Sequence, residues 1–169
     1  MTSATIGSSS FRLCAVSLDG SFRNQTNTVQ KRELAVLIYE LLENSTFVPI
    51  GHSGGPYRLC LALVEGRLVL SVTTEKGAPI LSHQLSLTPF HRLLKDYRFV
   101  CNSYSDASAR MLPERLEAID MGRRAIHNEA SELLKERLKS KVDIDHETAR
   151  RLFTLIYLLI TQNTPYRAD

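Results

Sequence analysis

Three short runs of alternating apolar residues, separated by two turn signals, constrain the fold of this chain most. Apolar residues alternate with others in 59–63, 68–72 and 81–87, and the runs are separated by Glu65-Gly66 and by Glu75-Lys76-Gly77. Alternation of this kind is typical of half-buried β-strands, and glycine-containing breaks are typical of hairpin turns. The pattern predicts a three-stranded antiparallel meander with one apolar face.

That apolar face needs a covering layer, and amphipathic helical segments flank the meander on both sides. The helices are predicted at residues 29–43, after Thr88-Pro89 through Val100, after Pro113 through Leu138, and after Asp145. Hydroxyl and carboxylate side chains favour the helix N-cap, and proline favours the first helical position, so we expect Thr88 and Asp145 to act as caps. With a further N-terminal strand at 11–18, these elements predict an α+β fold in which the meander packs against four helices.

The last predicted helix has an unusually wide apolar surface. The apolar residues on or beside one face are Leu152, Phe153, Leu155, Ile156, Tyr157, Leu159 and Ile160. A helix of this kind either lies at the centre of the core or takes part in self-association. We favour the central position, and the second interpretation is the reason to consider a homodimer.

A chain of 169 residues can bury a core without metal or disulfide support. We expect one domain over residues 11–163, a disordered tail over 1–10 and a second tail over 164–169. The N-terminus has no signal-peptide pattern, and the most apolar stretch, 152–160, falls well short of the roughly 20 residues that span a bilayer. No membrane segment is therefore predicted.

The three cysteines, Cys14, Cys60 and Cys101, stand at spacings that match neither a disulfide framework nor a zinc site. Free thiols in the cytoplasm are the expectation. No two of the five histidines have the spacing of a helical zinc pair, so we expect neither a metal nor another cofactor. His83 falls on the apolar side of its strand, where a core role is more common than a ligand role.

Polar residues gather on the helix that begins at Pro113. The candidates for ligand binding there are Asp120, Arg123, Arg124, His127, Asn128 and Glu129. Positions three and four apart are neighbours on a helix, so an acid, two arginines and an imidazole form one strip. The arginines could hold a phosphate or carboxylate while His127 moves a proton, and Gly122 would let a ligand or backbone approach. The alternative is an exposed helix face with ordinary ion pairs.

A glycine-rich loop before the meander is the second candidate site. The residues singled out there are His52, Gly54, Gly55, Tyr57 and Arg58. Backbone N–H groups in such a loop can surround an anion. The loop lacks the lysine and the following helix of a P-loop, and the alternative is a tight connection from helix to sheet.

Several strings resemble a bacterial uncharacterised protein family, numbered two-six-two. They are GHSGGPYRL at 51–59, LSLTPF at 85–90, KDY at 95–97, EAIDMGRRAIHNE at 117–129, LLKERL at 133–138 and TARRLFTL at 148–155. The resemblance covers residues 29 to 160 and includes both candidate sites. It implies a small cytoplasmic bacterial protein and carries no activity, substrate or partner.

The net charge of +3, from 21 basic and 18 acidic residues, implies no particular class of partner. The leading hypothesis is a non-enzymatic interaction or regulatory module, dimeric, whose protein partner contacts residues 51–58 and 123–129. The alternative is a small enzyme or binding domain for a phosphorylated or nucleotide-like ligand, with His127 as the candidate catalytic residue. RNA binding through basic residues on the helices is a third hypothesis, and the sequence leaves open whether the chain is an enzyme.

Overall fold

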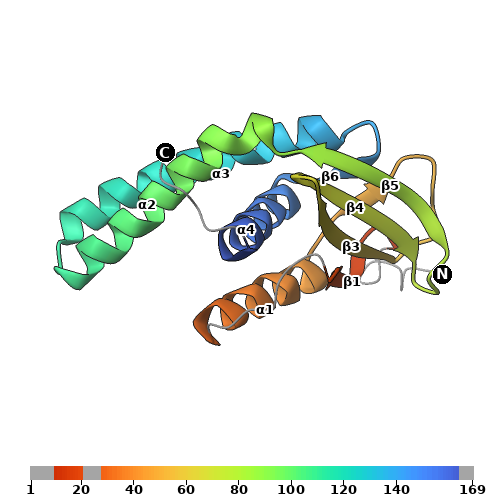
Figure 1. The fold of residues 1–169 in the computed structure, drawn as a ribbon, viewed down its shortest axis with the longest axis horizontal. Coiled ribbons are helices and arrows are strands. Elements are labelled where there is room, and N and C mark those ends of the chain that lie inside the picture. The colour runs from red at the N-terminus through yellow and green to blue at the C-terminus, as the bar shows by residue number, and fades with distance from the viewer. Residues whose placement is uncertain (1–9, 21–27, 164–169) are drawn as a thin grey trace, which may run out of the picture.

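The computed structural model describes residues 10–20 and 28–163 of the chain (Figure 1). The predicted tails lie outside the described residues, apart from Ser10. The elements, in order, are β1 (Leu13–Leu18), α1 (Thr28–Glu43), β2 (Phe47–Pro49), β3 (Tyr57–Val64), β4 (Arg67–Thr74), β5 (Pro79–Ser86), the 3₁₀ turn η2 (Thr88–Phe90), α2 (His91–Ala109), α3 (Pro113–Leu138), β6 (Val142–Ile144) and α4 (His146–Asn163). The α+β class predicted from the sequence is confirmed.

Within the described residues, the main sheet has four strands in the order β1-β3-β4-β5. Strands β3, β4 and β5 pair antiparallel, which confirms the predicted meander. The turn between β3 and β4 uses positive φ angles at Glu65 (52°) and Gly66 (76°), as a two-residue hairpin requires. Strand β1 joins the edge of the meander parallel to β3, and the connection between the two strands contains α1 and β2.

A second, two-stranded sheet was not predicted from the sequence. Strand β2 pairs antiparallel with β6, and Phe47 lies opposite Ile144 while Pro49 lies opposite Val142. Each strand has three residues, which is too short for an alternation of apolar and polar positions to be recognised. The pair fastens the segment that precedes the meander to the connection between α3 and α4.

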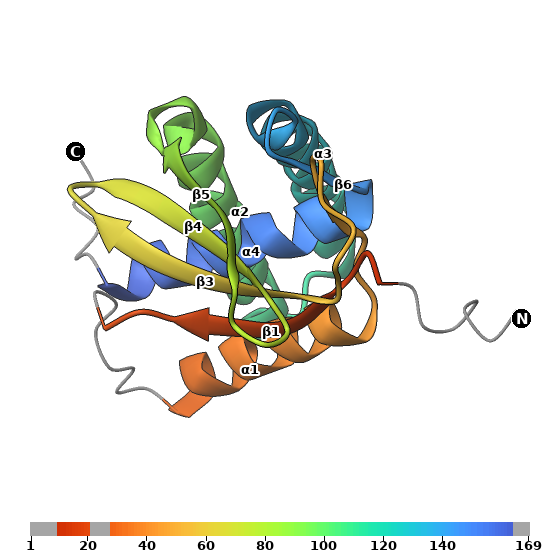
Figure 2. The same ribbon diagram turned by 90° about the vertical axis from the view of Figure 1, so that its right-hand side faces the viewer.

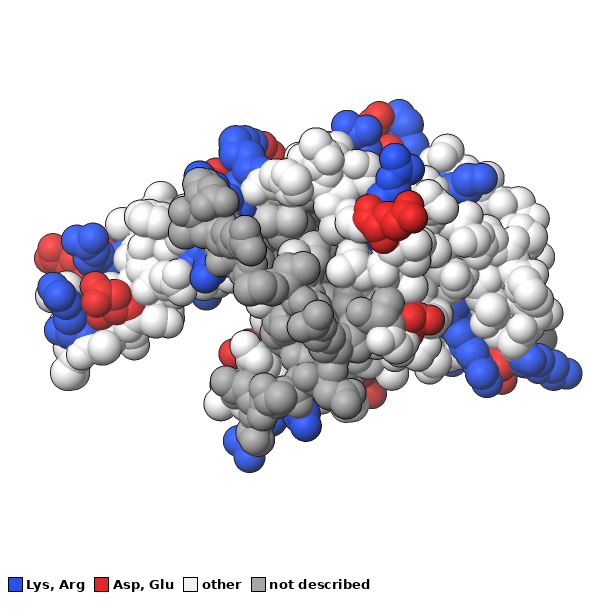
Figure 3. Space-filling model, in the orientation of Figure 1, with Lys and Arg blue, Asp and Glu red and all other residues white. Residues whose placement is uncertain are grey.

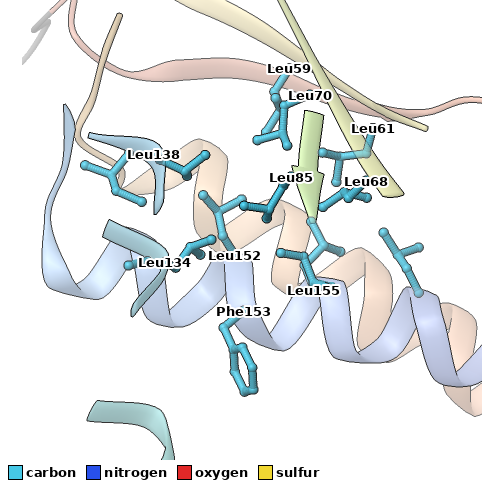
Figure 4. Packing of buried hydrophobic residues seen from close by; sticks show 14 of the residues in the cluster. Leu59, Leu61, Leu68, Leu70, Leu85, Leu134, Leu138, Leu152, Phe153 and Leu155 are labelled. Atoms are coloured by element: carbon cyan, nitrogen blue, oxygen red, sulfur yellow. The ribbon is translucent and has the colours of Figure 1, made fainter. Parts of the chain in front are cut away.

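Helix α4 lies at the centre of the molecule, between the sheet and the other helices (Figure 2). Leu152, Phe153, Leu155 and Leu159 are at most 2% exposed. Figure 4 shows leucines of the sheet on one side of α4 and Leu134 and Leu138 of α3 beside it. The predicted central position of this helix is confirmed, and its wide apolar surface is explained by contacts with several neighbours.

The ends of the helices agree with the prediction at two places and differ at a third. The backbone N–H of Thr148 donates a 2.9 Å hydrogen bond to Asp145 Oδ1, so Asp145 caps α4 as expected. Pro113 occupies the first turn of α3. Thr88 does not cap α2: it begins the 3₁₀ turn η2, which lacks a side-chain cap, and α2 starts at His91. The error arises because Pro89 sets the backbone angles of a 3₁₀ turn as readily as those of an α-helix.

The surroundings of Gly122 also differ from the prediction that a ligand or another backbone segment approaches this residue closely. A Cβ atom built on this residue would have no neighbour within 4 Å among the described residues, apart from the adjoining backbone of its own helix. Glycine in a helix costs stability because its unfolded backbone is unusually free. In α3 it therefore has that cost without a packing function.

The substitution Gly122→Ala should raise the free energy of unfolding by about 0.5–1 kcal/mol, since alanine gains helix propensity and meets no obstacle. Urea denaturation measures the change. The reverse substitution at an exposed position of the same helix, Ala118→Gly, is the matched control and should lower stability by a similar amount. A loss of stability in Gly122→Ala would show that something does contact this turn.

Candidate functional site

The strip predicted on α3 borders a cavity of about 480 Å³, referred to below as the basic cavity. Four helices contribute to its wall. The lining residues are Leu37 from α1, Tyr97 from α2, Asp120, Arg123, Arg124 and His127 from α3, and Arg150 and Thr154 from α4. The structure therefore brings the four residues of the strip together and adds residues of three further helices.

Sequence reasoning missed the contributions of Tyr97, Arg150 and Thr154. The pair Arg150-Arg151 stands out as basic, but nothing in the sequence indicates which helix it faces. In the structure only Arg150 lines the cavity. Arg151 points to the end of α1, where its Nη1 donates a 2.8 Å hydrogen bond to the carbonyl of Asn44.

The arginines of the cavity are held by neighbouring carboxylates. Arg123 donates a hydrogen bond to Asp120, and Arg124 Nη2 lies 2.8 Å from Asp120 Oδ2. Arg150 is paired with Glu147 at 3.1 Å. The hydrogen bond from Arg123, followed by the charges of both arginines, holds the pKa of Asp120 below its usual range. In the described part of the wall, three arginines face one carboxylate, so the balance of charge is positive.

His127 is a partly buried imidazole in this wall. Its Nε2 is buried and has no hydrogen-bond partner among residues 10–20 and 28–163. Its ring centroid lies 4.9 Å from that of Tyr97 and 6.5 Å from that of Phe153. Burial lowers the pKa of His127 to about 4, with Arg150 and Arg123 as the next causes, and the opposing effects of the two carboxylates are smaller. The imidazole is therefore neutral at pH 7 and lies in a positive potential.

Tyr97 stands at the side of the cavity with its hydroxyl hydrogen-bonded to the side chains of Cys101 and Thr154. Burial raises the pKa of this hydroxyl well above its usual value, so Tyr97 stays protonated. Its ring also contacts Tyr157 edge to face, with centroids 4.7 Å apart. These contacts fix the orientation of the ring against α4.

Asn128 and Glu129, the last two candidates on α3, do not line the cavity. Asn128 Oδ1 lies 3.2 Å from Nε2 of His146 at the start of α4. Glu129 accepts a hydrogen bond from Arg92 of α2. Each successive residue of an α-helix is rotated by about 100°, so Glu129 lies on the side opposite Asp120, and Asn128 lies at the edge of the strip beside Arg124.

Arg92 of α2 is one of the basic helix residues on which the RNA-binding hypothesis rests, and its charge is partly neutralised. Arg92 pairs with both Asp96 and Glu129. On the face shown in Figure 3, lysine and arginine side chains lie beside aspartate and glutamate, and no continuous basic stripe is visible. This arrangement does not favour a long nucleic-acid track on that face.

The glycine-rich loop, residues 51–57, lies elsewhere and has a packing function at its end. No residue of 51–58 lines the basic cavity. His52 and Gly54 are exposed, as is Arg58 on β3, whereas Tyr57 is fully buried with its ring 6.3 Å from that of Phe47. This arrangement fits the alternative interpretation of the loop as a tight connection to the sheet.

Gly55 is the position of closest approach in this loop. A Cβ atom built there would lie 1.7 Å from the carbonyl oxygen of Ser10 and 2.7 Å from Cε2 of Tyr57. The backbone before β1 therefore occupies the space that any side chain would need. At Gly54, one residue earlier, no atom in the described part of the chain, other than its two chain neighbours, lies within 4 Å of such a Cβ atom.

The cysteines and His83, which lie outside the basic cavity, show no arrangement that indicates a reactive or metal-binding site among the described residues. Cys14, Cys60 and Cys101 are free and partly buried. His83 is partly buried on β5, and burial lowers its pKa. Across the described ranges, no group of three or more His, Cys, Asp or Glu side chains is placed to hold a metal. None of the helices in those ranges combines the length and apolar character of a bilayer span.

Comparison with known proteins gives a consistent family assignment. The model of "Uncharacterised protein family (UPF0262)" matches residues 10–162. A UPF0262 protein of Rhizobium etli is 53% identical over 149 residues, which are 88% of this chain and 94% of that protein. A relative in Agrobacterium fabrum is 49% identical, and the match covers 91% of this chain and 98% of that protein. A relative in Methylobacterium radiotolerans is 50% identical, and the match covers 88% of this chain and 92% of that protein. No solved structure matches the chain.

The substitution Gly55→Ala should lower the free energy of unfolding by about 1–3 kcal/mol, because the added methyl group must displace the Ser10 backbone or the Tyr57 ring. Gly54→Ala is the matched control and should change stability by less than about 0.5 kcal/mol. Thermal and urea unfolding measure both. Equal effects of the two substitutions would contradict the packing function assigned to Gly55.

His127 should make the stability of the fold depend on pH. An unfolded histidine titrates near 6.5 and the folded one near 4, so between these values the unfolded chain binds a proton that the folded chain does not. The free energy of unfolding should therefore fall as the pH is lowered from 6.5 towards 4, by at most about 1.4 kcal/mol per pH unit and by less where solvent screens the site.

The measurement is urea unfolding between pH 7 and pH 5, before most carboxylates titrate. His127→Gln should show a clearly shallower dependence than the unmodified chain. His91→Gln, on the exposed side of α2, is the control and should keep the full dependence. The same slope in all three proteins would refute the environment assigned to His127.

Proposed function

Because the chain belongs to the uncharacterised protein family UPF0262, whose name carries no activity, we propose its function from the basic cavity itself. The protein is a binding domain for a small phosphate-bearing ligand, which occupies the space between α1, α2, α3 and α4. The functional unit is the single domain of residues 11–163, and its location is the cytoplasm.

The observation that carries the proposal is the convergence of Arg123, Arg124 and Arg150 on one cavity that also contains His127. Guanidinium groups form paired, charge-assisted hydrogen bonds with phosphate oxygens. The cavity volume of about 480 Å³ is within the usual range for small-ligand sites, roughly 300–1,000 Å³. The Nε2 of His127, which has no hydrogen-bond partner among the described residues, is buried in the same wall.

The electrostatics around the imidazole agree with an anionic ligand. Arg150 and Arg123 each affect the pKa of His127 more strongly than Glu147 or Asp120 does. A negative group that enters the cavity would therefore meet a favourable potential although two carboxylates are near. The carboxylates hold the arginines in place before the ligand binds, which reduces the entropy lost on binding.

Ligand binding has more support than an interaction module that would use residues 51–58 and 123–129 as one contact surface. No residue of 51–58 lines the basic cavity, and Glu129 pairs with Arg92 instead of facing it. Binding also has more support than acid–base catalysis, since an imidazole with a pKa of about 4 is a weak base at neutral pH.

The test is isothermal titration with inorganic phosphate, pyrophosphate, a sugar phosphate and a nucleoside monophosphate at fixed ionic strength. We expect at least one of them to bind and to raise the melting temperature. Arg123→Gln and Arg150→Gln should each weaken that binding by about 10- to 100-fold, since a hydrogen bond to a charged group contributes roughly 1.5–3 kcal/mol. His127→Phe, which retains a ring, should weaken it less.

The matched control is Arg67→Gln, which removes an exposed arginine of β4 outside the cavity and should leave binding unchanged. Loss of binding in this variant as well would indicate a general response to net charge. Absence of binding by all four compounds, or equal binding by Arg123→Gln and the unmodified chain, would overturn the proposal.

A further inference from the structure

A second hollow adjoins the basic cavity. It has a volume of about 630 Å³ and lies between α1, α2 and α4, and it is called the apolar groove below. Its apolar wall includes Val29 and Val36 of α1, Cys101 of α2, and Tyr157 and Leu158 of α4. The two valines are 60% and 54% exposed, which is unusual for apolar residues of a helix that packs on a core.

The groove and the basic cavity share part of their walls. Leu37, Tyr97 and Thr154, one residue from each of α1, α2 and α4, line both spaces. The two spaces are therefore neighbours, and these three side chains form the wall that they share. A ligand bound in the basic cavity has the groove directly beside it.

Several side chains in the groove wall carry polar groups, among them Gln30 and Tyr157, and the hydroxyls of the threonines and of Tyr97 already have partners. Thr154 and Thr161 donate their hydroxyl protons to carbonyls of α4, at 3.0 Å and 2.8 Å respectively. The Tyr97 hydroxyl is hydrogen-bonded to neighbouring side chains. Two charged residues of opposite sign, Arg32 and Glu33 of α1, also line the groove. An aliphatic group in the groove would replace water without leaving these threonine and tyrosine hydroxyls unpaired.

From this juxtaposition we propose that the ligand is an amphiphile: a phosphate group on a single alkyl or acyl chain, with the phosphate at Arg123 and Arg150 and the chain in the apolar groove. The inference rests on the proposed function and names the ligand class for the same site. The orientation follows from the balance of charge, because the basic cavity is lined by three arginines and one carboxylate, whereas the groove is lined by one arginine, Arg32, and one carboxylate, Glu33. A wholly polar phosphate compound would leave the groove unused.

The test compares methyl, butyl and octyl phosphate by isothermal titration, at concentrations below micelle formation as checked by light scattering. Affinity should rise with chain length by about 2- to 4-fold per methylene group that enters the groove. In the double variant Val29→Asn/Val36→Asn, this gain should fall by at least half on a logarithmic scale, while the affinity for methyl phosphate stays the same. Both valines are largely exposed, so the variant should fold.

The matched control is the double variant Ile50→Asn/Val64→Asn, whose residues are 52% and 49% exposed and lie outside the groove. It should keep the full dependence on chain length. Arg123→Gln should weaken all three compounds by a similar factor, since it removes a contact with the head group that they share.

The dependence of affinity on chain length and the effect of Arg123→Gln together separate the two proposals. If methyl phosphate binds and longer chains add nothing, the amphiphile inference is wrong and the phosphate-binding function stands. If affinity grows with chain length but Arg123→Gln has no effect, the chain binds without the arginines and both proposals are wrong. If none of the alkyl phosphates binds, the amphiphile inference is wrong, and the titration with the four phosphate compounds decides whether the phosphate-binding function stands. Equal loss of the chain-length effect in the two double variants would exclude the groove as its cause.

Discussion

The contact between the apolar face of the meander and α4 determines where the other elements can lie. Leu59 and Leu61 of β3 and Leu70 of β4 are buried with Leu152 and Leu155 of α4 (Figure 4). Burial of one such side chain stabilises a fold by roughly 1.5–3 kcal/mol, so this layer supplies a large share of the driving force. Because α4 covers the sheet with one side, α1 and the α2–α3 hairpin pack on its remaining sides. The basic cavity and the apolar groove are the spaces left between these helices.

Much of the fold was predictable because its elements have a local signal. The meander follows from alternation, and the helices from the spacing of leucines and from Pro113 and Asp145. The parallel placement of β1 and the β2–β6 pair were not predictable, since each joins segments separated by other elements. Thr88 shows a different limit, because a hydroxyl followed by proline precedes a 3₁₀ turn as well as an α-helix.

The candidate site was predictable only along one helix. The spacing of Asp120, Arg123 and His127 places them on a common strip whatever the fold, whereas Tyr97 and Arg150 join them through tertiary packing. Close approach occurs at a different glycine from the one expected: the helical Gly122 has no described neighbour beside it, and the loop residue Gly55 meets a neighbouring backbone. A glycine in the sequence permits close approach, but the path of another segment decides whether it occurs.

The β2–β6 pair also bears on the order in which the chain folds. Its neighbourhood includes a hydrogen bond from the Thr46 backbone to Thr148 Oγ1, which joins residues 102 positions apart. The strands of the meander, by contrast, are linked by tight turns and can pair early. Closing a long loop costs chain entropy before any contact compensates for it. Folding should therefore begin with the meander and local helices, and the step that limits its rate should be the docking of the α3–α4 connection onto β2.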